Sequence, residues 1–384
     1  MKLLILLLCC LLTGCAASEA PETPEATIAT TVSETAAETI PEPTVPPTTL
    51  PPDPIKEIIG DMSLQERVGQ LFLARCDDTV ALADIETYHL SGFVLFGRDF
   101  EGQTPDSLRE KLAAYQSAAK VPLLIAVDEE GGTVTRVSSN PSFRQKKFPS
   151  PRSLYEGGGM EAVLLCEKEK CLLLSSLGIN VNLAPVCDIT TDPSAFLYSR
   201  SLGQSPEITA QFVSDTVREM HSNRIGSCLK HFPGYGNNAD THIGMATDSR
   251  SLEALESCDL IPFYAGIQAG ADAILVSHTI VEALDPLTPA SLSPGVHQYL
   301  RNEMGFDGVI VTDDLVMQAI TDQYGAGEAA VLAVLAGNDL LCASDYRTQY
   351  DAVYAAVLEG RIDIDTLNNA VRNVLEWKTE LGLL

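Results

Sequence analysis

The chain has 384 residues, and its 52 aspartates and glutamates outnumber its 25 lysines and arginines, which gives a formal net charge of −27 at pH 7. A charge of this sign argues against nucleic acid and other anionic polymers as general partners. A neutral substrate, or one that is recognised locally, fits the composition better.

The N-terminus begins with Met1-Lys2 and an apolar run from Leu3 to Leu12. A run this short cannot cross a bilayer of roughly 30 Å as a helix, so it is typical of the hydrophobic region of a signal peptide. The following Leu12-Thr13-Gly14-Cys15 resembles a bacterial lipobox, which would make Cys15 a diacylated N-terminus. The alternative is an ordinary secretory signal cleaved near Ala17. We expect an exported protein that contacts the cell membrane only through the lipid on Cys15.

Residues 16–54 contain no lysine or arginine, seven acidic residues and otherwise mostly Thr, Pro, Ala and Ser. Such a segment cannot bury enough apolar surface to offset the entropy of ordering it, and its prolines favour an extended chain. The predicted organisation is therefore a signal peptide at 1–15, a disordered tether at 16–54 and a catalytic domain at 55–384.

The catalytic domain alternates short apolar runs with amphipathic stretches. Eight runs are predicted to be strands: Leu71–Ala74, Gly92–Phe96, Leu123–Val127, Val181–Val186, Gly226–Leu229, Ala273–Val276, Gly308–Val311 and Asp339–Cys342. Helix starts are marked by Ser63 with Glu66, by Ser205-Pro206 and by Ser293-Pro294. Eight strand-then-helix units predict an α/β fold of the (β/α)8 TIM-barrel type in one domain. We expect a monomer.

Polar residues gather on the C-terminal side of these runs, where the loops of a barrel build the active site. They are Arg98-Asp99, Asp128-Glu129-Glu130-Gly131-Gly132, Asp188, Lys230-His231, Ser277-His278 and Asp313-Asp314. This one-sided distribution indicates an enzyme.

Cysteine and histidine spacing gives little support to a metal or cofactor. Seven cysteines lie in the catalytic domain, an odd number, and several are inside apolar runs, so buried thiols are expected rather than a disulfide framework. Cys166 and Cys171 have no histidine nearby, and no His-x₃-His spacing supports zinc at Asp128 or at Asp240 and His242. We expect no metal and no cofactor.

Two carboxylate motifs carry candidate chemistry. Asp313 ends a predicted strand, where a carboxylate can act as a nucleophile, bind a metal or cap a helix; we assign it as the nucleophile and give Asp314 a supporting or capping role. In the loop Pro233–Arg250, Asp240 is two residues from His242 and can orient the imidazole for proton transfer. Taken alone, that pair fits a solvated Asp and His in a surface loop better than a catalytic pair.

Four further polar residues suit sugar binding. Lys230 and His231 offer donors at the barrel mouth, Asp128 can accept from hydroxyls and Arg200 can donate to them. Lys230 also fits a Schiff base, the usual rival in a barrel. Each of the four fits a solvated or salt-bridged rim residue as well.

Taken together, the motifs resemble glycoside hydrolase family 3, in particular its single-barrel β-N-acetylglucosaminidases. The resemblance covers nearly all of residues 55–384 in order. Its motifs are Gly92-Phe93-Val94-Leu95-Phe96, Val127-Asp128-Glu129-Glu130-Gly131-Gly132, Asn182-Leu183-Ala184-Pro185-Val186 with Asp188, Arg200-Ser201-Leu202-Gly203, Lys230-His231-Phe232-Pro233-Gly234, Asp240-Thr241-His242, Ser277-His278 and Phe306-Asp307-Gly308-Val309-Ile310-Val311-Thr312-Asp313.

The resemblance implies a role for each candidate. Asp313 matches the nucleophile, and His242 matches the acid/base, polarised by Asp240. The sugar-binding residues of the −1 subsite are matched by Asp128, Arg200, Lys230 and His231. The implied reaction is retaining, exo-acting hydrolysis of β-linked N-acetylglucosamine, and export suggests peptidoglycan or chitin fragments as the carbohydrate substrate.

Two departures from the family pattern leave alternatives open. Glu129 stands where a Gln is usual and Tyr235 where a His is usual, so contacts near Asp128 and Lys230 are expected to differ. A family 3 β-glucosidase remains an alternative. A glycoside phosphorylase is another, because an imidazole base repels phosphate less than a carboxylate would. A non-catalytic sugar-binding surface lipoprotein is the third.

Overall fold

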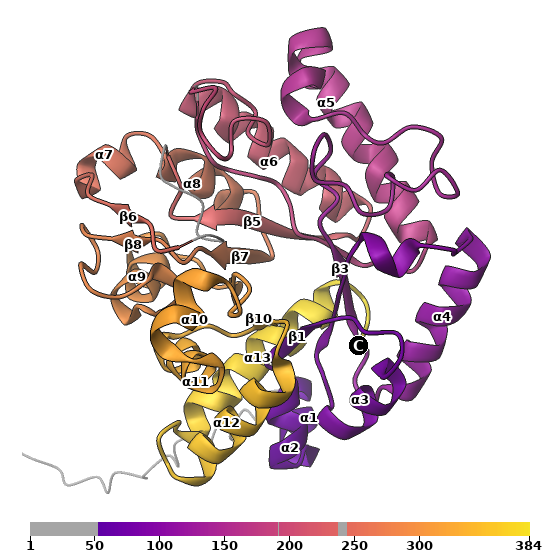
Figure 1. Cartoon of the computed structure of the whole chain (residues 1–384), viewed down its shortest axis with the longest axis vertical. Helices are drawn as coiled ribbons and strands as arrows, with labels where there is room; N and C mark the ends of the chain where they lie inside the picture. Colours follow the sequence, from indigo (N-terminus) through magenta and orange to yellow (C-terminus); the bar gives the residue numbers. More distant parts are fainter. Residues whose placement is uncertain (1–52, 191, 237–243) are drawn as a thin grey trace, which may run out of the picture. The chain divides into compact units, whose positions relative to one another are not determined.

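The computed structural model describes residues 53–190, 192–236 and 244–384 (Figure 1). The predicted signal peptide, Cys15 and almost all of the tether lie outside the described residues, as do Asp240 and His242. Among the described helices, none is both long enough and apolar enough to cross a membrane.

Eight parallel strands form a closed barrel in the order β10-β1-β2-β3-β4-β5-β7-β9. Their bounds are β1 Phe72–Arg75, β2 Gly92–Leu95, β3 Leu124–Val127, β4 Val181–Asn182, β5 Gly226–Phe232, β7 Ala273–Val276, β9 Val309–Thr312 and β10 Leu341–Ala343. A parallel bridge from Val311 to Leu340 joins β9 to β10. The predicted (β/α)8 architecture is confirmed.

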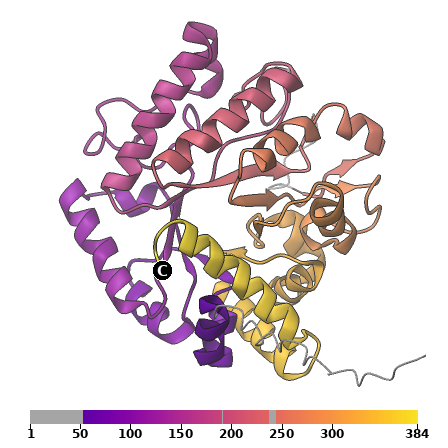
Figure 2. The same cartoon turned by 180° about the vertical axis from the view of Figure 1, so that it is seen from behind.

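Helices surround this barrel (Figures 1 and 2). They are α1 Pro54–Asp61, α2 Leu64–Gly69, α3 Ala81–Tyr88, α4 Pro105–Ala118, α5 Pro151–Ser176, α6 Pro206–Ser222, α7 Leu252–Glu256, α8 Leu260–Gln268, α9 Pro294–Gln298, α10 Gln318–Tyr324, α11 Ala326–Ala336, α12 Tyr346–Leu358 and α13 Ile364–Glu380, with short helical turns η1 Gly97–Phe100, η2 Ala290–Leu292 and η3 Tyr299–Glu303. A small parallel pair, β6 Thr247–Asp248 and β8 Ile280–Val281, lies beside the barrel.

The predicted helix starts are confirmed. Ser63 and Glu66 form a capping box at α2, in which each side chain accepts from the backbone N–H of the other residue. Ser205 and Ser293 cap α6 and α9, and a proline occupies the first helical position in both cases. A proline is favourable there because its missing N–H would have no partner inside the helix.

The end of the barrel at which the strands begin is closed by α13. Val374, Trp377 and Leu381 pack into the same apolar cluster as the inward-facing residues of the strands. The Trp377 ring lies so close to Gly226, the first residue of β5, that a Cβ there would be 3.0 Å from it. We call this end the floor and the opposite end the mouth.

The observed strand limits lie within two residues of the predicted ones, except at the mouth ends of two strands. β4 ends at Asn182 instead of Val186; Pro185, within the predicted part that is not strand, has no N–H to donate to a ladder. β5 continues past Leu229 to Phe232, so Lys230 and His231 lie within the strand and not after it; they are joined by a cis peptide bond. The backbone carbonyl of Lys230 accepts from the N–H of Cys187 at 2.7 Å, which extends the ladder.

Candidate active site

A cavity of about 860 Å³ opens at the mouth of the barrel. Beside apolar residues such as Val94, Leu183 and Leu275, its wall carries these charged and ionisable side chains: Arg75, Asp128, Glu130, Arg136, Arg200, Lys230, His231, Asp313 and Asp314. The structure therefore brings together all of the predicted site residues that it describes.

Lys230 is the centre of a buried ion-pair network. Its Nζ lies 2.7 Å from Asp128 Oδ1 and 2.7 Å from Glu130 Oε1. Arg200 binds both oxygens of Glu130, at 2.9 Å through Nε and at 2.7 Å through Nη2. Such bidentate pairs are strong and fix the geometry of both partners.

The network sets the protonation of its members. Burial opposes charge on Lys230, but the carboxylates of Asp128 and Glu130 outweigh it and raise the pKa of the ammonium. Burial likewise works against ionised Asp128, yet Lys230 and Arg136 hold the pKa of that carboxyl below its usual value. A Schiff base requires a neutral amine, so the Schiff-base alternative for Lys230 does not fit this site.

His231 is held by Asp188, a buried residue that the sequence placed at the mouth without a role. Asp188 Oδ2 accepts from the backbone N–H of His231 at 3.0 Å and lies 2.8 Å from the ring Nδ1, while its Oδ1 accepts from the backbone N–H of Tyr235. This arrangement favours a proton on Nδ1, leaving Nε2 to face Arg200 Nη2 at 3.1 Å. Tyr235 packs edge-on against the His231 ring, with the centroids 5.5 Å apart.

Asp313 and Asp314 have different surroundings. Asp313 directly follows β9, and its Oδ1 accepts from the backbone N–H of Asp314 at 2.9 Å. Asp314 also lines the cavity, and its oxygens accept from the backbone N–H and the hydroxyl of Ser344, directly after β10. Because α10 begins only at Gln318, the helix-cap interpretation of these carboxylates is wrong. Within the described parts of the chain, no lysine or arginine forms an ion pair with Asp313.

Glu129 and Glu130 point in different directions, as predicted for adjacent residues. The Glu129 carboxylate is fully buried and accepts from the backbone N–H groups of Arg136, Val137 and Ser138 and from the Ser138 hydroxyl. It thereby holds the loop that carries Arg136, whose Nη2 is 3.4 Å from Asp128 Oδ2. The sequence indicated only that Glu129 departs from the family pattern, not that its carboxylate organises a loop.

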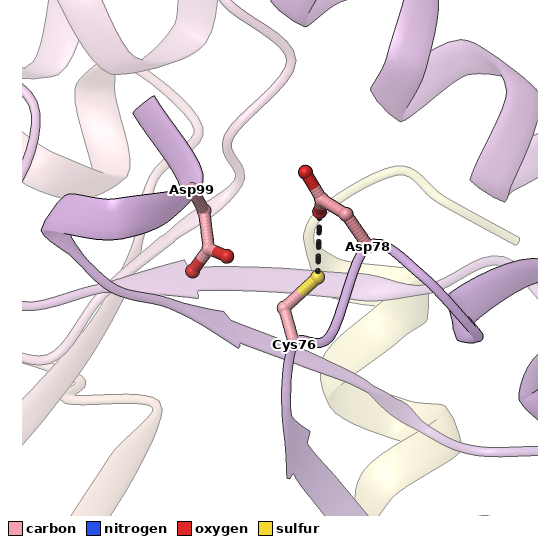
Figure 3. Close-up of side chains that lie close together, drawn as sticks. All are labelled: Cys76, Asp78 and Asp99. Atoms are coloured by element: carbon pink, nitrogen blue, oxygen red, sulfur yellow. Dashed lines mark hydrogen bonds between the residues drawn. The ribbon is translucent and has the colours of Figure 1, made fainter. Parts of the chain in front are cut away.

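A second charged cluster lies outside this cavity, after β1 and within η1. Figure 3 shows Cys76, Asp78 and Asp99, three potential metal ligands whose donor atoms lie within 4.8 Å of one another. Lys111 Nζ already binds Asp78 Oδ2 at 2.7 Å, and burial raises the pKa of the Cys76 thiol, which keeps it protonated. Asp99 accepts from the backbone N–H of Phe96 at 2.6 Å. We assign this cluster to holding the loop that presents Phe96.

Comparisons with known proteins agree with this geometry. Residues 63–377 match the family model described as Glycosyl hydrolase family 3 N terminal domain. A β-hexosaminidase of Stenotrophomonas maltophilia K279a is 36% identical over 304 residues, which cover 76% of this chain and 86% of that protein.

Two solved structures are also similar. A glycoside hydrolase family 3 β-N-acetylglucosaminidase from Paenibacillus sp. str. FPU-7 is 35% identical, with a TM-score of 0.78 over 84% of this chain and 63% of that chain. A β-N-acetylhexosaminidase from Beutenbergia cavernae is 27% identical, with a TM-score of 0.75 over 83% of this chain and 99% of that chain.

Proposed function

Since the chain belongs to glycosyl hydrolase family 3, we propose that this glycoside hydrolase releases terminal β-linked N-acetylglucosamine from its substrate through a covalent glycosyl-aspartate intermediate. The specificity is supported by the relatives and solved structures that are named for β-hexosaminidase or β-N-acetylglucosaminidase activity. The mechanism is supported by the different environments of the carboxylates at the mouth.

One observation carries the choice of nucleophile. Asp128 and Glu130 both form an ion pair with Lys230, which lowers the nucleophilicity of their carboxylates. These two carboxylates are better suited to binding sugar hydroxyls or to holding Lys230 in place. Asp313 lines the same cavity, and among the described residues its carboxylate accepts one hydrogen bond, at Oδ1 from Asp314 N–H. Its second oxygen is left for attack on an anomeric carbon.

In the proposed reaction, Lys230, His231, Arg200 and Asp128 hold the ring hydroxyls of the terminal sugar. Asp313 attacks the anomeric carbon while His242 protonates the leaving oxygen. His242, oriented by Asp240, then removes a proton from the water that releases the sugar. Two displacements at one carbon retain the anomeric configuration.

The test is turnover of para-nitrophenyl β-N-acetylglucosaminide by the full chain. We expect Asp313→Asn to lower kcat by at least about 10³-fold, and Asp314→Asn to lower it far less. An activated fluoro-sugar should label the parent on Asp313. Comparable turnover of the matching glucoside would favour the β-glucosidase alternative, and full activity in Asp313→Asn would overturn the assignment. A folded parent without turnover would favour a binding lipoprotein.

We also propose that the protein is exported and anchored through diacylated Cys15, where it meets peptidoglycan or chitin fragments. The lipobox-like Leu12-Thr13-Gly14-Cys15 and the acidic, proline-rich segment after it support this proposal. In a bacterial host, Cys15→Ala should abolish incorporation of labelled palmitate and move the protein out of the membrane fraction. Labelling that persists in this variant would contradict the anchor.

A further inference from the structure

Arg75, the last residue of β1, lines the cavity, and no described residue forms an ion pair with it. Its Nε is buried without a hydrogen-bond partner, and within residues 53–190, 192–236 and 244–384 its guanidinium makes no hydrogen bond or ion pair. Acidic residues outnumber lysine and arginine by 52 to 25 in this chain, so a cavity-lining arginine without a carboxylate is unexpected. By contrast, Lys230 and Arg200, which line the same cavity, both form ion pairs with carboxylates.

Phe96 holds this arginine in place. The Arg75 guanidinium carbon lies 4.5 Å from the centre of the Phe96 ring, and that of Arg136 lies 5.3 Å from the same centre. Nε of Arg136 is also buried without a partner, and its one side-chain contact with Asp128 is long, at 3.4 Å. A guanidinium over an aromatic ring keeps its N–H groups pointing outward in its own plane, available to a ligand.

We propose that Arg75, together with Arg136 on the same Phe96 ring, forms a subsite for an oxyanion, either a carboxylate or a phosphate group. The planar fork of a guanidinium matches two oxygens of such a group. A sugar hydroxyl would engage a single donor and leave the charge of Arg75 uncompensated in a partly buried wall. The paired wall around Lys230 suits neutral hydroxyls, whereas the Arg75 wall suits a charged substituent.

This subsite rests on the proposed function and would narrow its substrate. Peptidoglycan fragments carry the lactyl carboxylate of N-acetylmuramic acid, whereas chitin fragments carry no anionic group. The same chemistry would also accept free inorganic phosphate as a second substrate in place of water. The two sources of the oxyanion give different products, so one set of variants separates them.

The first arm compares an acid with its neutral counterpart. The substrates are the β-1,4-linked disaccharide of N-acetylglucosamine and N-acetylmuramic acid, and the methyl ester of its lactyl carboxylate. We expect the parent to prefer the acid in kcat/KM, and Arg75→Met to lower the acid-to-ester ratio by about 10- to 100-fold. Arg75→Lys should keep part of the preference. Because the readout is a ratio, a loss common to both substrates cancels.

A matched control is available at the next strand. Arg98 follows β2, and half of its side chain is exposed to solvent, away from the cavity wall. Arg98→Met removes the same charge from the same rim, and it should leave the acid-to-ester ratio unchanged. If both variants changed the acid-to-ester ratio equally, the preference for the acid would come from the overall electrostatic field of the protein, and the proposed subsite would be wrong.

The second arm adds inorganic phosphate. Formation of N-acetylglucosamine 1-phosphate by the parent, lost in Arg75→Met, would assign the subsite to free phosphate. If neither the ratio nor the phosphate-dependent product differs between parent and Arg75→Met, the inference is wrong. If the parent cleaves no glycoside, the proposed function fails. Calorimetry with N-acetylmuramic acid and with phosphate then tests the subsite by itself. Binding to Arg75→Met that is at least about tenfold weaker than to the parent supports the subsite, and equal affinity overturns it.

Discussion

The two ends of the barrel treat a buried lysine in opposite ways. At the mouth, Lys230 has two carboxylates at 2.7 Å, and they raise the pKa of its ammonium despite burial. At the floor, Lys378 on α13 is completely buried, and its ammonium donates one hydrogen bond to a described residue, to Gln70 Oε1 at 2.7 Å. Burial alone lowers the pKa of Lys378 to about 7. The partner, not the depth of burial, decides whether a lysine keeps its charge.

This difference matches what each end does. The mouth holds fixed charges, which arrange a polar substrate before the reaction begins. The floor seals the apolar interior of the strands, and a neutral amine is accommodated there as part of the packing. Substitutions that remove one charge should therefore have opposite effects at the two ends.

The largest effect is expected at the mouth, from Lys230→Met. It leaves Asp128 and Glu130 buried with less compensation, so stability should fall by about 3–5 kcal/mol. Activity on the nitrophenyl substrate should fall by about 10³-fold or more, because the hydroxyl-binding wall loses its centre. Urea unfolding and steady-state kinetics would measure the two losses. If Lys230→Met were active and as stable as the parent, the mouth would not depend on the charge of Lys230, and the contrast between the two ends would be wrong.

The same substitution at the floor, Lys378→Met, should raise stability. A folded-state pKa near 7, below the ordinary 10.5, means that the folded state binds fewer protons than the unfolded state between these values. The parent's unfolding free energy should therefore rise as the pH increases from about 7 to about 10, and this rise should vanish in the variant. Since Gln70 loses its partner, we expect a net gain of about 1–3 kcal/mol near pH 7.

The kinetic constants of Lys378→Met provide the control, because α13 contributes no residue to the cavity wall. We expect kcat/KM within about twofold of the parent. Urea unfolding across this pH range is the measurement. A variant that is less stable than the parent at pH 7 would show that Lys378 has a favourable partner after all.

A smaller effect is expected from Glu129→Gln, which tests whether the mouth needs a carboxylate at this position. An amide offers one acceptor oxygen in place of two, and its NH₂ group would face backbone N–H donors of the Arg136 loop. In Glu129→Gln we expect kcat/KM to fall about tenfold, because Arg136 would be misplaced. Ser138→Ala removes a single hydrogen bond to the Glu129 carboxylate, so its kcat/KM should fall less. Unchanged kinetics in Glu129→Gln would show that the loop is held by other contacts.

The smallest effect concerns a second floor residue with the opposite pH dependence. His221 Nε2 lies 2.9 Å from Asp272, and this hydrogen bond raises the pKa of the imidazole. Because the pKa of His221 is higher in the folded than in the unfolded state, the protonated imidazole stabilises the folded protein fully at pH values below the unfolded-state pKa of about 6.5. This stabilisation is lost as the pH rises through the folded-state pKa. Because the imidazole is partly exposed, His221→Gln should cost less than about 1 kcal/mol at pH 6 and nothing at pH 9. Equal costs at both pH values would exclude this titration.

The strands and helix starts could be predicted because their signals are local. A short apolar run is enough to identify a barrel strand, and Ser-Pro fixes a helix start within two residues. The limits of β4 and β5 were missed because they depend on pairing between distant segments, such as Cys187 with Lys230. The roles of Asp188, Glu129 and Arg75 were missed for the same reason: each is defined by contacts, or by a lack of contacts, far along the chain. The acid/base pair Asp240 and His242 came from the family resemblance and remains a prediction.

The closure of the barrel also has a kinetic consequence. Phe72 in β1 pairs with Leu341 in β10, so the first and last strands of the sheet meet across most of the domain. A contact of such high sequence separation requires a large loss of chain entropy before it adds stability, which slows folding. Until β1 pairs with β10, the facing edges of these two strands have unpaired backbone groups that can pair with another chain. Conditions that delay this pairing should therefore promote aggregation even when the folded enzyme is fully stable.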